Sequence, residues 1–346
     1  MSSKSFAFEL SVLGKSRGRH PSFTVMNRLG DFILRGLRKT YRIVFNAHPV
    51  MLPFENDPDR ASEIIYKQLV GEKPCMVARF GSGELQVVTN WRSVMQGKHS
   101  ILRFIKDEEF QWWWNDAFLE GLCRNAGFFP LDMENISRFC EMMIRDMKLV
   151  DVLGSWRWEE KYFIEELESS VKVRLTFIEP FYSKDPWTRV LEGKHILVIH
   201  PFAEEITRQY HEHREQLFED KRVLPEFASL RVVKAVQSLG GASNGFKDWF
   251  EALEWMKKQM DSEPYDIALI GCGAYGFPLA AHAKRTGHKA VHIGGGLQLL
   301  FGIKGKRWEN PSKKNVISKF FNEYWIRPDA INTPAIAHKI ENGCYW

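Results

Sequence analysis

The stretch His195-Ile196-Leu197-Val198-Ile199-His200 is a short apolar run, and a helical pattern follows it from Ala203 to Phe218. The alternation continues to residue 293, with strands predicted at 230–236, 266–270 and 290–293 and helices at 246–260 and 275–286. Strands that alternate with helices form parallel sheets, because each helix carries the chain back to the starting edge. We therefore expect an α/β fold with a Rossmann-like, mainly parallel sheet flanked by helices.

A further strand–turn–helix unit lies nearer the amino terminus. Residues 76–80 predict a buried strand, Gly81 and Gly83 a sharp turn, and Leu85 begins helical spacing. In open α/β sheets, ligands bind at such strand ends, where helix amino termini present free amides. Arg79 could pair there with a phosphate and Glu84 with a divalent cation. The alternative is that Glu84 only complements the helix dipole and Arg79 lies on the surface.

The segment Arg79-Phe80-Gly81-Ser82-Gly83-Glu84-Leu85 resembles the Arg-Phe-Gly-Asp-Gly-Glu signature of GT-D-type glycosyltransferases. In this family the Asp-x-Glu of the signature binds the metal and the nucleotide-sugar diphosphate, so the resemblance implies that Ser82 and Glu84 lie at that site and that Arg79, Gly81 and Gly83 shape the diphosphate turn. Glu84 would be a catalytic residue that either holds manganese or magnesium or orients a sugar hydroxyl. Ser82 stands where the family has aspartate, so the implied metal site has one charged ligand fewer. The resemblance extends more loosely over residues 60–310, toward proteins encoded among bacterial surface-polysaccharide genes.

A second glycine turn, Gly271-Cys272-Gly273-Ala274-Tyr275-Gly276, has the spacing of a dinucleotide-binding turn. That fingerprint also needs an acidic residue at the end of the next strand, and His292-Ile293-Gly294 stands there instead. We expect Gly271, Gly273 and Tyr275, with His200 at a neighbouring strand end, to bind a mononucleotide diphosphate or a phosphosugar. A dehydrogenase or epimerase that uses NAD is the less favoured alternative.

Further candidates follow other predicted elements. Glu179 and Asp185 come after a strand predicted at 171–178, and either could be a general base for an acceptor hydroxyl. The loop that carries Lys304, Lys306 and Arg307 could neutralise a departing diphosphate, and a solvated loop is the alternative. Cys272 is either a small buried residue or a nucleophile with a pKa lowered by a helix amino terminus.

Composition indicates a globular chain. Its 346 residues are 44% hydrophobic and 13% aromatic, which is ample for a packed core in one large or two ordinary domains. Five scattered cysteines without a Cys-x-x-Cys pair suit a reducing compartment. No apolar run reaches membrane-spanning length and no secretory signal is recognisable, so we expect a cytoplasmic protein.

The positive charge is concentrated at one end. The net charge is +5, but residues 1–50 contribute +7 and the remainder −2, which argues against a nucleic-acid groove through the core. Residues 27–45 predict a basic amphipathic helix. One alternative is that this helix rests on the anionic inner face of the membrane. The other is that it packs on the domain with its basic side chains in solvent.

The predicted organisation is a basic arm and helix at 1–50, an α/β catalytic domain at 51–310, either whole or in two halves (51–190 and 191–310), and a helix with a packed tail at 311–346. Other predicted helices span 107–125, 131–148, 158–169 and 315–325. The first contains Trp112, Trp113 and Trp114, of which we expect at least one to be exposed, either as a platform for sugar or lipid or as a partner contact. Core packing is the other alternative.

The resemblance to the GT-D signature implies a glycosyltransferase that transfers a sugar from a nucleotide-sugar donor to a glycan or glycolipid acceptor in bacterial surface-polysaccharide synthesis. A non-catalytic scaffold that keeps the sugar-nucleotide fold is the main alternative, because Ser82 replaces the family's aspartate.

Overall fold

The computed structural model describes residues 28–309, 316–334, 337–339 and 343–346. In this part of the chain, one seven-stranded sheet has the order β3-β2-β1-β7-β6-β4-β5, and every neighbouring pair is parallel. The predicted α/β fold is therefore confirmed. The strands are β1 (Met76–Ala78), β2 (Val152–Ser155), β3 (Val171–Arg174), β4 (His195–His200), β5 (Ser229–Lys234), β6 (Ile267–Ile270) and β7 (Lys289–His292).

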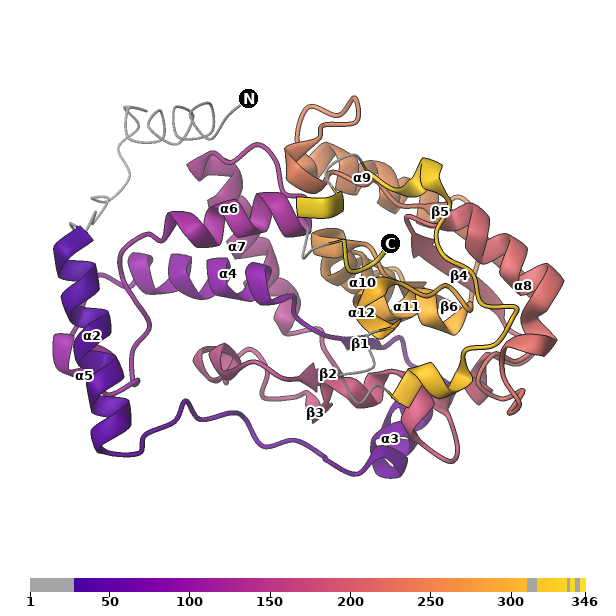
Figure 1. The fold of residues 1–346 in the computed structure, drawn as a ribbon, viewed down its shortest axis with the longest axis horizontal. Helices are drawn as coiled ribbons and strands as arrows, with labels where there is room; N and C mark the ends of the chain where they lie inside the picture. Colours follow the sequence, from indigo (N-terminus) through magenta and orange to yellow (C-terminus); the bar gives the residue numbers. More distant parts are fainter. Residues whose placement is uncertain (1–27, 310–315, 335–336, 340–342) are drawn as a thin grey trace.

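Helices cover both faces of the sheet (Figure 1). In β4, Leu197 and Ile199 belong to one core and Ile196 and Val198 to the other, because successive strand residues point to opposite faces. The first core contains residues of α4 (Ser82–Met95), α6 (Asp116–Ala126), α7 (Met133–Met147), α9 (Trp249–Met260) and α10 (Gly276–Arg285). The second contains residues of α3 (Pro58–Val70), α8 (Ala203–Leu217), α11 (Leu297–Leu300) and α12 (Lys306–Glu309).

Several predicted elements are shorter than expected. The helices expected at 158–169 and 315–325 are reduced to the 3-10 helices Trp158–Phe163 and Val316–Phe320, and the strand expected at 171–178 ends at Arg174. The tail packs on the body as predicted, since Trp346 is buried and its Nε1 donates to the carbonyl of Asn332. The remaining 3-10 helices are Leu175–Ile178, Pro180–Tyr182, Trp187–Leu191, Leu239–Gly241, Gly273–Tyr275, Gly294–Gly296, Ala330–Asn332 and Ala337–Lys339.

The prediction for residues 107–125 was wrong at its start, because α6 begins only at Asp116. Tertiary hydrogen bonds hold the preceding segment out of a helix: the Asn90 amide donates to the carbonyls of Gln111 and Trp113 at 3.1 and 2.9 Å. Trp112 and Trp113 are buried and Trp114 is half-buried, so the expected exposed indole is not found.

The amino-terminal helix forms as predicted, as α2 (Arg28–Val44), and it packs beside α5 (Ile101–Ile105) (Figure 1). Its orientation corrects the expectation of a solvated basic face. Arg38 donates to the carbonyls of Phe104 and Glu109, and Arg42 pairs with Asp107, so part of the basic face is turned toward the body.

Candidate functional site

A cavity of about 360 Å³ lies at the carboxyl ends of the strands. Its lining includes one residue at or just after each of five strands: Arg79 (β1), Trp156 (β2), His200 (β4), Gly271 (β6) and His292 (β7). Strands β1–β3 and β4–β7 meet at the pairing of β1 with β7, and strand ends at such junctions form the ligand crevice of open α/β sheets.

The structure brings most of the predicted site residues to this cavity. Those that line it are Arg79, Gly81, Ser82, Gly83, Glu84, His200, Gly271, Gly273, Tyr275 and Arg307. Glu179, Asp185, Lys304 and Lys306 are not among the lining residues. Two segments that are far apart in the sequence, residues 79–84 and 271–275, therefore share one site.

Arg79 follows β1 and lies against Gly294, where an added Cβ would be 3.5 Å from the arginine Cδ. Among the described residues, its guanidinium has no hydrogen bond and no ion pair. It makes a cation–π contact with Trp156, with Cζ 5.3 Å from the ring centroid. Burial lowers the pKa of Arg79, and the carboxylates of Glu84 and Glu179 act in the opposite direction. A guanidinium that lines a cavity without hydrogen bonds can bind an anion through two parallel donors.

The charges of the lining are predominantly positive. Arg79, Arg124 and Arg307 are its described arginines, and Glu84 is its described acidic residue. Arg307 donates to the Tyr345 hydroxyl at 3.3 Å and lies over that ring at 4.8 Å. A cavity with this balance favours anions, because few carboxylates oppose the arginines at short range.

The helices that begin at the cavity have amino termini of two kinds, with and without a side-chain cap. α4, α8, α10 and α11 have no side-chain cap, and residues at their starts line the cavity. Ala117 and Phe118 at the start of α6 also line the cavity, but the Asn115 side chain caps this helix. Side chains of Asp57, Ser100, Asp132 and Asp248 cap α3, α5, α7 and α9. First-turn amides without a side-chain cap are available to an anionic ligand.

Two buried histidines in the lining are neutral, because burial lowers the pKa of both His200 and His292 to about 3. The amide of Phe202 donates to His200 Nδ1 at 3.0 Å, which places the His200 proton on Nε2. His292 Nδ1 lies 3.2 Å from the carbonyl of Ile270 and must donate to it, so its Nε2 is an acceptor. The pair therefore offers one hydrogen-bond donor and one acceptor without charge.

The late glycine turn is explained by contacts within the chain. A Cβ on Gly271 would lie 2.6 Å from the carbonyl oxygen of Gly294, and one on Gly276 would lie 2.2 Å from the His292 ring. Gly273 has a φ of +57°, a conformation that favours glycine. These close approaches account for the glycine spacing without a dinucleotide.

We expect Gly271→Ala to lower the free energy of unfolding of the ligand-free protein by about 2 to 3 kcal/mol, because the new methyl group overlaps the backbone carbonyl oxygen of Gly294. Gly121→Ala is the matched control: a Cβ there meets no atom within 4 Å, and alanine stabilises a helix by about 1 kcal/mol relative to glycine. Urea unfolding measures both. A Gly271→Ala protein of wild-type stability would contradict the packing explanation.

Tyr275 and Cys272 are held by the fold in ways that limit their chemistry. The Tyr275 hydroxyl lies 2.6 Å from Ser238 Oγ, and Ser238 donates to the carbonyl of Gly127. Burial raises the pKa of the Cys272 thiol, which opposes the thiolate that a nucleophile needs. The structure therefore supports the small buried residue for Cys272.

Glu179 lies behind the cavity wall. A Cβ on Gly296 would meet its carboxylate oxygen at 2.6 Å, so the absence of a side chain at Gly296 makes room for it. Burial raises the pKa of Glu179 to about 7, and Arg79 and Arg307 oppose this shift. Glu179 can thus change the net charge next to both arginines near neutral pH.

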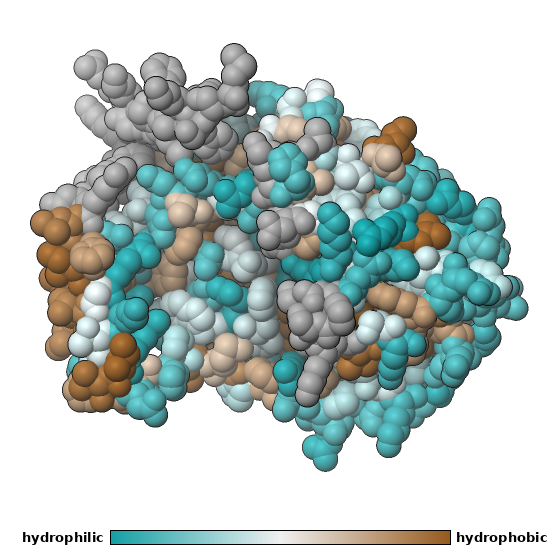
Figure 2. Space-filling model, in the orientation of Figure 1, coloured by the Kyte–Doolittle hydropathy of each residue, from teal (hydrophilic) through white to brown (hydrophobic). Residues whose placement is uncertain are grey.

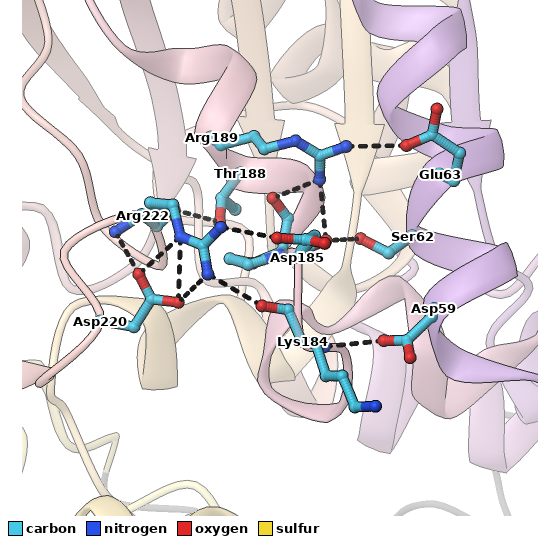
Figure 3. A network of polar contacts seen from close by, with 10 residues as sticks. Asp59, Ser62, Glu63, Lys184, Asp185, Thr188, Arg189, Asp220 and Arg222 are labelled. Atoms are coloured by element: carbon cyan, nitrogen blue, oxygen red, sulfur yellow. Dashed lines mark hydrogen bonds and ion pairs between the residues drawn. The ribbon is translucent and has the colours of Figure 1, made fainter.

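Asp185 belongs to a different part of the molecule. It pairs with Arg222 at 2.6 Å, in an exposed network that also contains Asp220 and Lys184 (Figure 3). The backbone carbonyl of Asp185 accepts from Ser62 of α3, so the residue ties two surface segments together. The structure does not bring Asp185 to the cavity.

The basic loop contributes only in part. Lys304 lies 3.9 Å from Glu309 and over the Phe321 ring, and the Lys306 side chain is exposed. Of the three, only Arg307, in α12, lines the cavity.

Sequence reasoning missed Trp156, His292 and Tyr345 as lining residues. Trp156 follows β2 as Arg79 follows β1, and this position was an available signal. Tyr345 lies in the tail, and no local pattern indicates that the tail folds back over the strand ends.

The donor set does not by itself form a cation site. Glu84 is the acidic residue of the described lining, and its carboxylate interacts electrostatically with Arg79. The described residues contain no group of three possible metal ligands. A magnesium ion in a protein commonly takes one or two carboxylates together with substrate phosphates. We therefore assign no step to a cation.

Comparison of the chain with protein-family models, with curated proteins and with solved structures gives no match. The resemblance to the GT-D signature consequently stays a prediction. In the described residues, no helix combines the length and apolarity that a membrane span requires.

Proposed function

We propose that this chain is a glycosyltransferase that binds the diphosphate of a nucleotide-sugar donor in the cavity at the carboxyl ends of β1 and β7. The observation that carries the proposal is Arg79, a half-buried arginine at a strand end whose guanidinium has no hydrogen bond among the described residues. Such a group is costly in a ligand-free fold, and a diphosphate would satisfy its donors.

Other features of the site support the same ligand. Arg307 adds positive charge to the lining, where a diphosphate leaving group would accumulate negative charge. Neutral His200 and His292 can hydrogen-bond a sugar or base without adding charge. The volume of about 360 Å³ lies in the usual range for ligand pockets.

Glu84 is the carboxylate best placed to contact a sugar hydroxyl or a donor-bound cation, since it lines the cavity in the first turn of α4. The resemblance of residues 79–85 to the GT-D signature supports a glycan or glycolipid acceptor from bacterial surface-polysaccharide synthesis. A cytoplasmic location remains part of this proposal.

A non-catalytic scaffold is the second candidate, and Ser82 favours it, because this serine supplies no charge at the family's aspartate position. In this alternative, the cavity would bind a nucleotide sugar without turnover.

The test is a thermal-shift screen against nucleoside diphosphates, their sugar conjugates and NAD(P), each with and without manganese. A ligand at 100 times its dissociation constant stabilises the fold by about 2.7 kcal/mol, which is easily measured. We expect a shift with one sugar nucleotide that weakens in Glu84→Ala, and donor hydrolysis or transfer by the wild type. A shift without turnover, also in Ser82→Asp, would favour the scaffold, and a response to NAD(P) alone would contradict both.

A further inference from the structure

The outer side of α2 carries an apolar surface that the fold leaves uncovered. Phe32 is 75% exposed and Ile43 is 71% exposed, although both belong to a well-formed helix. Figure 2 shows hydrophobic side chains along the edge of the molecule where Figure 1 places α2. We define the α2–α5 face by its exposed apolar residues: Leu29, Phe32, Ile33, Leu37, Ile43, Val44, Ile101 and Leu102.

The orientation of α2 is fixed by its polar side. Arg35 donates to Gln111 at 3.0 Å, Arg38 donates to the carbonyls of Phe104 and Glu109, and Arg42 pairs with Asp107 at 2.6 Å. Leu34 is the buried apolar residue of this helix. With a period of 3.6 residues per turn, the residues that anchor the helix and those of the apolar face lie on different sides.

Exposed cations accompany this apolar face. Lys39 on α2 and Arg103 and Lys106 on or next to α5 are exposed, as is Lys98 just before α5, whereas Glu108 is the exposed acidic residue near α5. Apolar side chains with basic residues beside them match an anionic lipid surface, where the apolar groups enter the headgroup region and the cations face the lipid phosphates. Two copies joined through this face would bring like charges together.

We propose that the α2–α5 face docks this protein on an anionic bilayer surface. The helix lies in the interface plane and does not cross the bilayer, and its arginine contacts with the body keep the protein attached to it. This inference does not depend on the proposed activity, since binding is measured without a substrate.

The experiment is sedimentation of the full chain with vesicles of phosphatidylcholine, with and without phosphatidylglycerol. We expect binding to the anionic vesicles, and a loss of at least about tenfold in the partition coefficient for Phe32→Ser with Ile33→Ser. Ile164→Ser with Val171→Ser is the matched control, because both residues are exposed apolar residues outside this face. Lys39→Gln with Arg103→Gln should reduce binding to anionic vesicles and leave binding to neutral vesicles unchanged.

Equal binding by Phe32→Ser with Ile33→Ser would overturn the proposal, as would a failure of the full chain to bind. Sedimentation velocity on the same samples identifies the other occupants. A dimer that dissociates in this variant assigns the face to a second copy. A monomer in both proteins, without vesicle binding, would overturn the proposal and exclude a second copy as well. Thermal melts of all variants confirm that they are folded, as expected for exposed positions.

Discussion

Arg79→Met should bind a nucleotide-sugar diphosphate about a hundredfold more weakly than the wild type, and its ligand-free form should be more stable. Arg79 is half-buried, and among the described residues its guanidinium has no hydrogen bond that would offset its partial desolvation. Methionine fills a similar volume without charge, so the stability cost disappears together with the phosphate contacts. Thermal shift and calorimetric titration measure the two effects separately.

The control is Arg231→Met, a half-buried arginine distant from the cavity. Arg231 donates to the carbonyls of Gln259 and Met260 at 2.8 and 2.9 Å, so its loss should lower stability and leave ligand binding unchanged. Arg79→Lys should retain part of the affinity, because a lysine keeps the charge but not the forked geometry. If Arg79→Met binds the donor like the wild type, the cavity is not the diphosphate site.

Glu179→Gln should remove a pH dependence of stability worth about 3 kcal/mol. The pKa of Glu179 is raised from 4.5 to about 7, chiefly by burial. Between these two pKa values the folded protein keeps a proton that the unfolded chain has released. The stability contributed by this group is therefore fully present below pH 4.5, falls as the pH rises, and is lost above about 7. Urea unfolding of wild type and variant at several pH values between about 5 and 8 measures this difference.

The same variant should change donor binding. Above about pH 7, ionised Glu179 offsets the charge of Arg79 and Arg307, and the affinity of the wild type for an anionic donor should fall a few-fold. Glu179→Gln should keep its affinity across this range. A nucleotide sugar is the suitable probe, because its diphosphate has no ionisation near neutral pH, and the exposed Glu226→Gln is the control. Parallel pH profiles for Glu179→Gln and wild type would show that Glu179 does not act on the site.

Local patterns in the sequence were sufficient to predict the strands, most long helices and the strand ends at which the cavity lies. The alternation from His195 to Ile293 predicts a parallel sheet, and the turns that follow the strands at Phe80 and Ile270 must then lie at the same edge. The period of α2 is likewise a property of consecutive residues. These features depend on contacts between near neighbours, and side-chain periodicity records such contacts directly.

The tertiary structure alone decided which side chains meet and which remain without a partner. Glu179 and Asp185 follow the same strand, yet one lies beside the arginines of the cavity and the other pairs with Arg222 at the surface. The Gly296 position that admits Glu179, the tail that brings Tyr345 to the cavity and the arginines that hold α2 with its apolar side outward all depend on residues far apart in the chain. Burial, and with it pKa and unsatisfied hydrogen bonding, is set by such distant contacts, which local sequence periodicity does not encode.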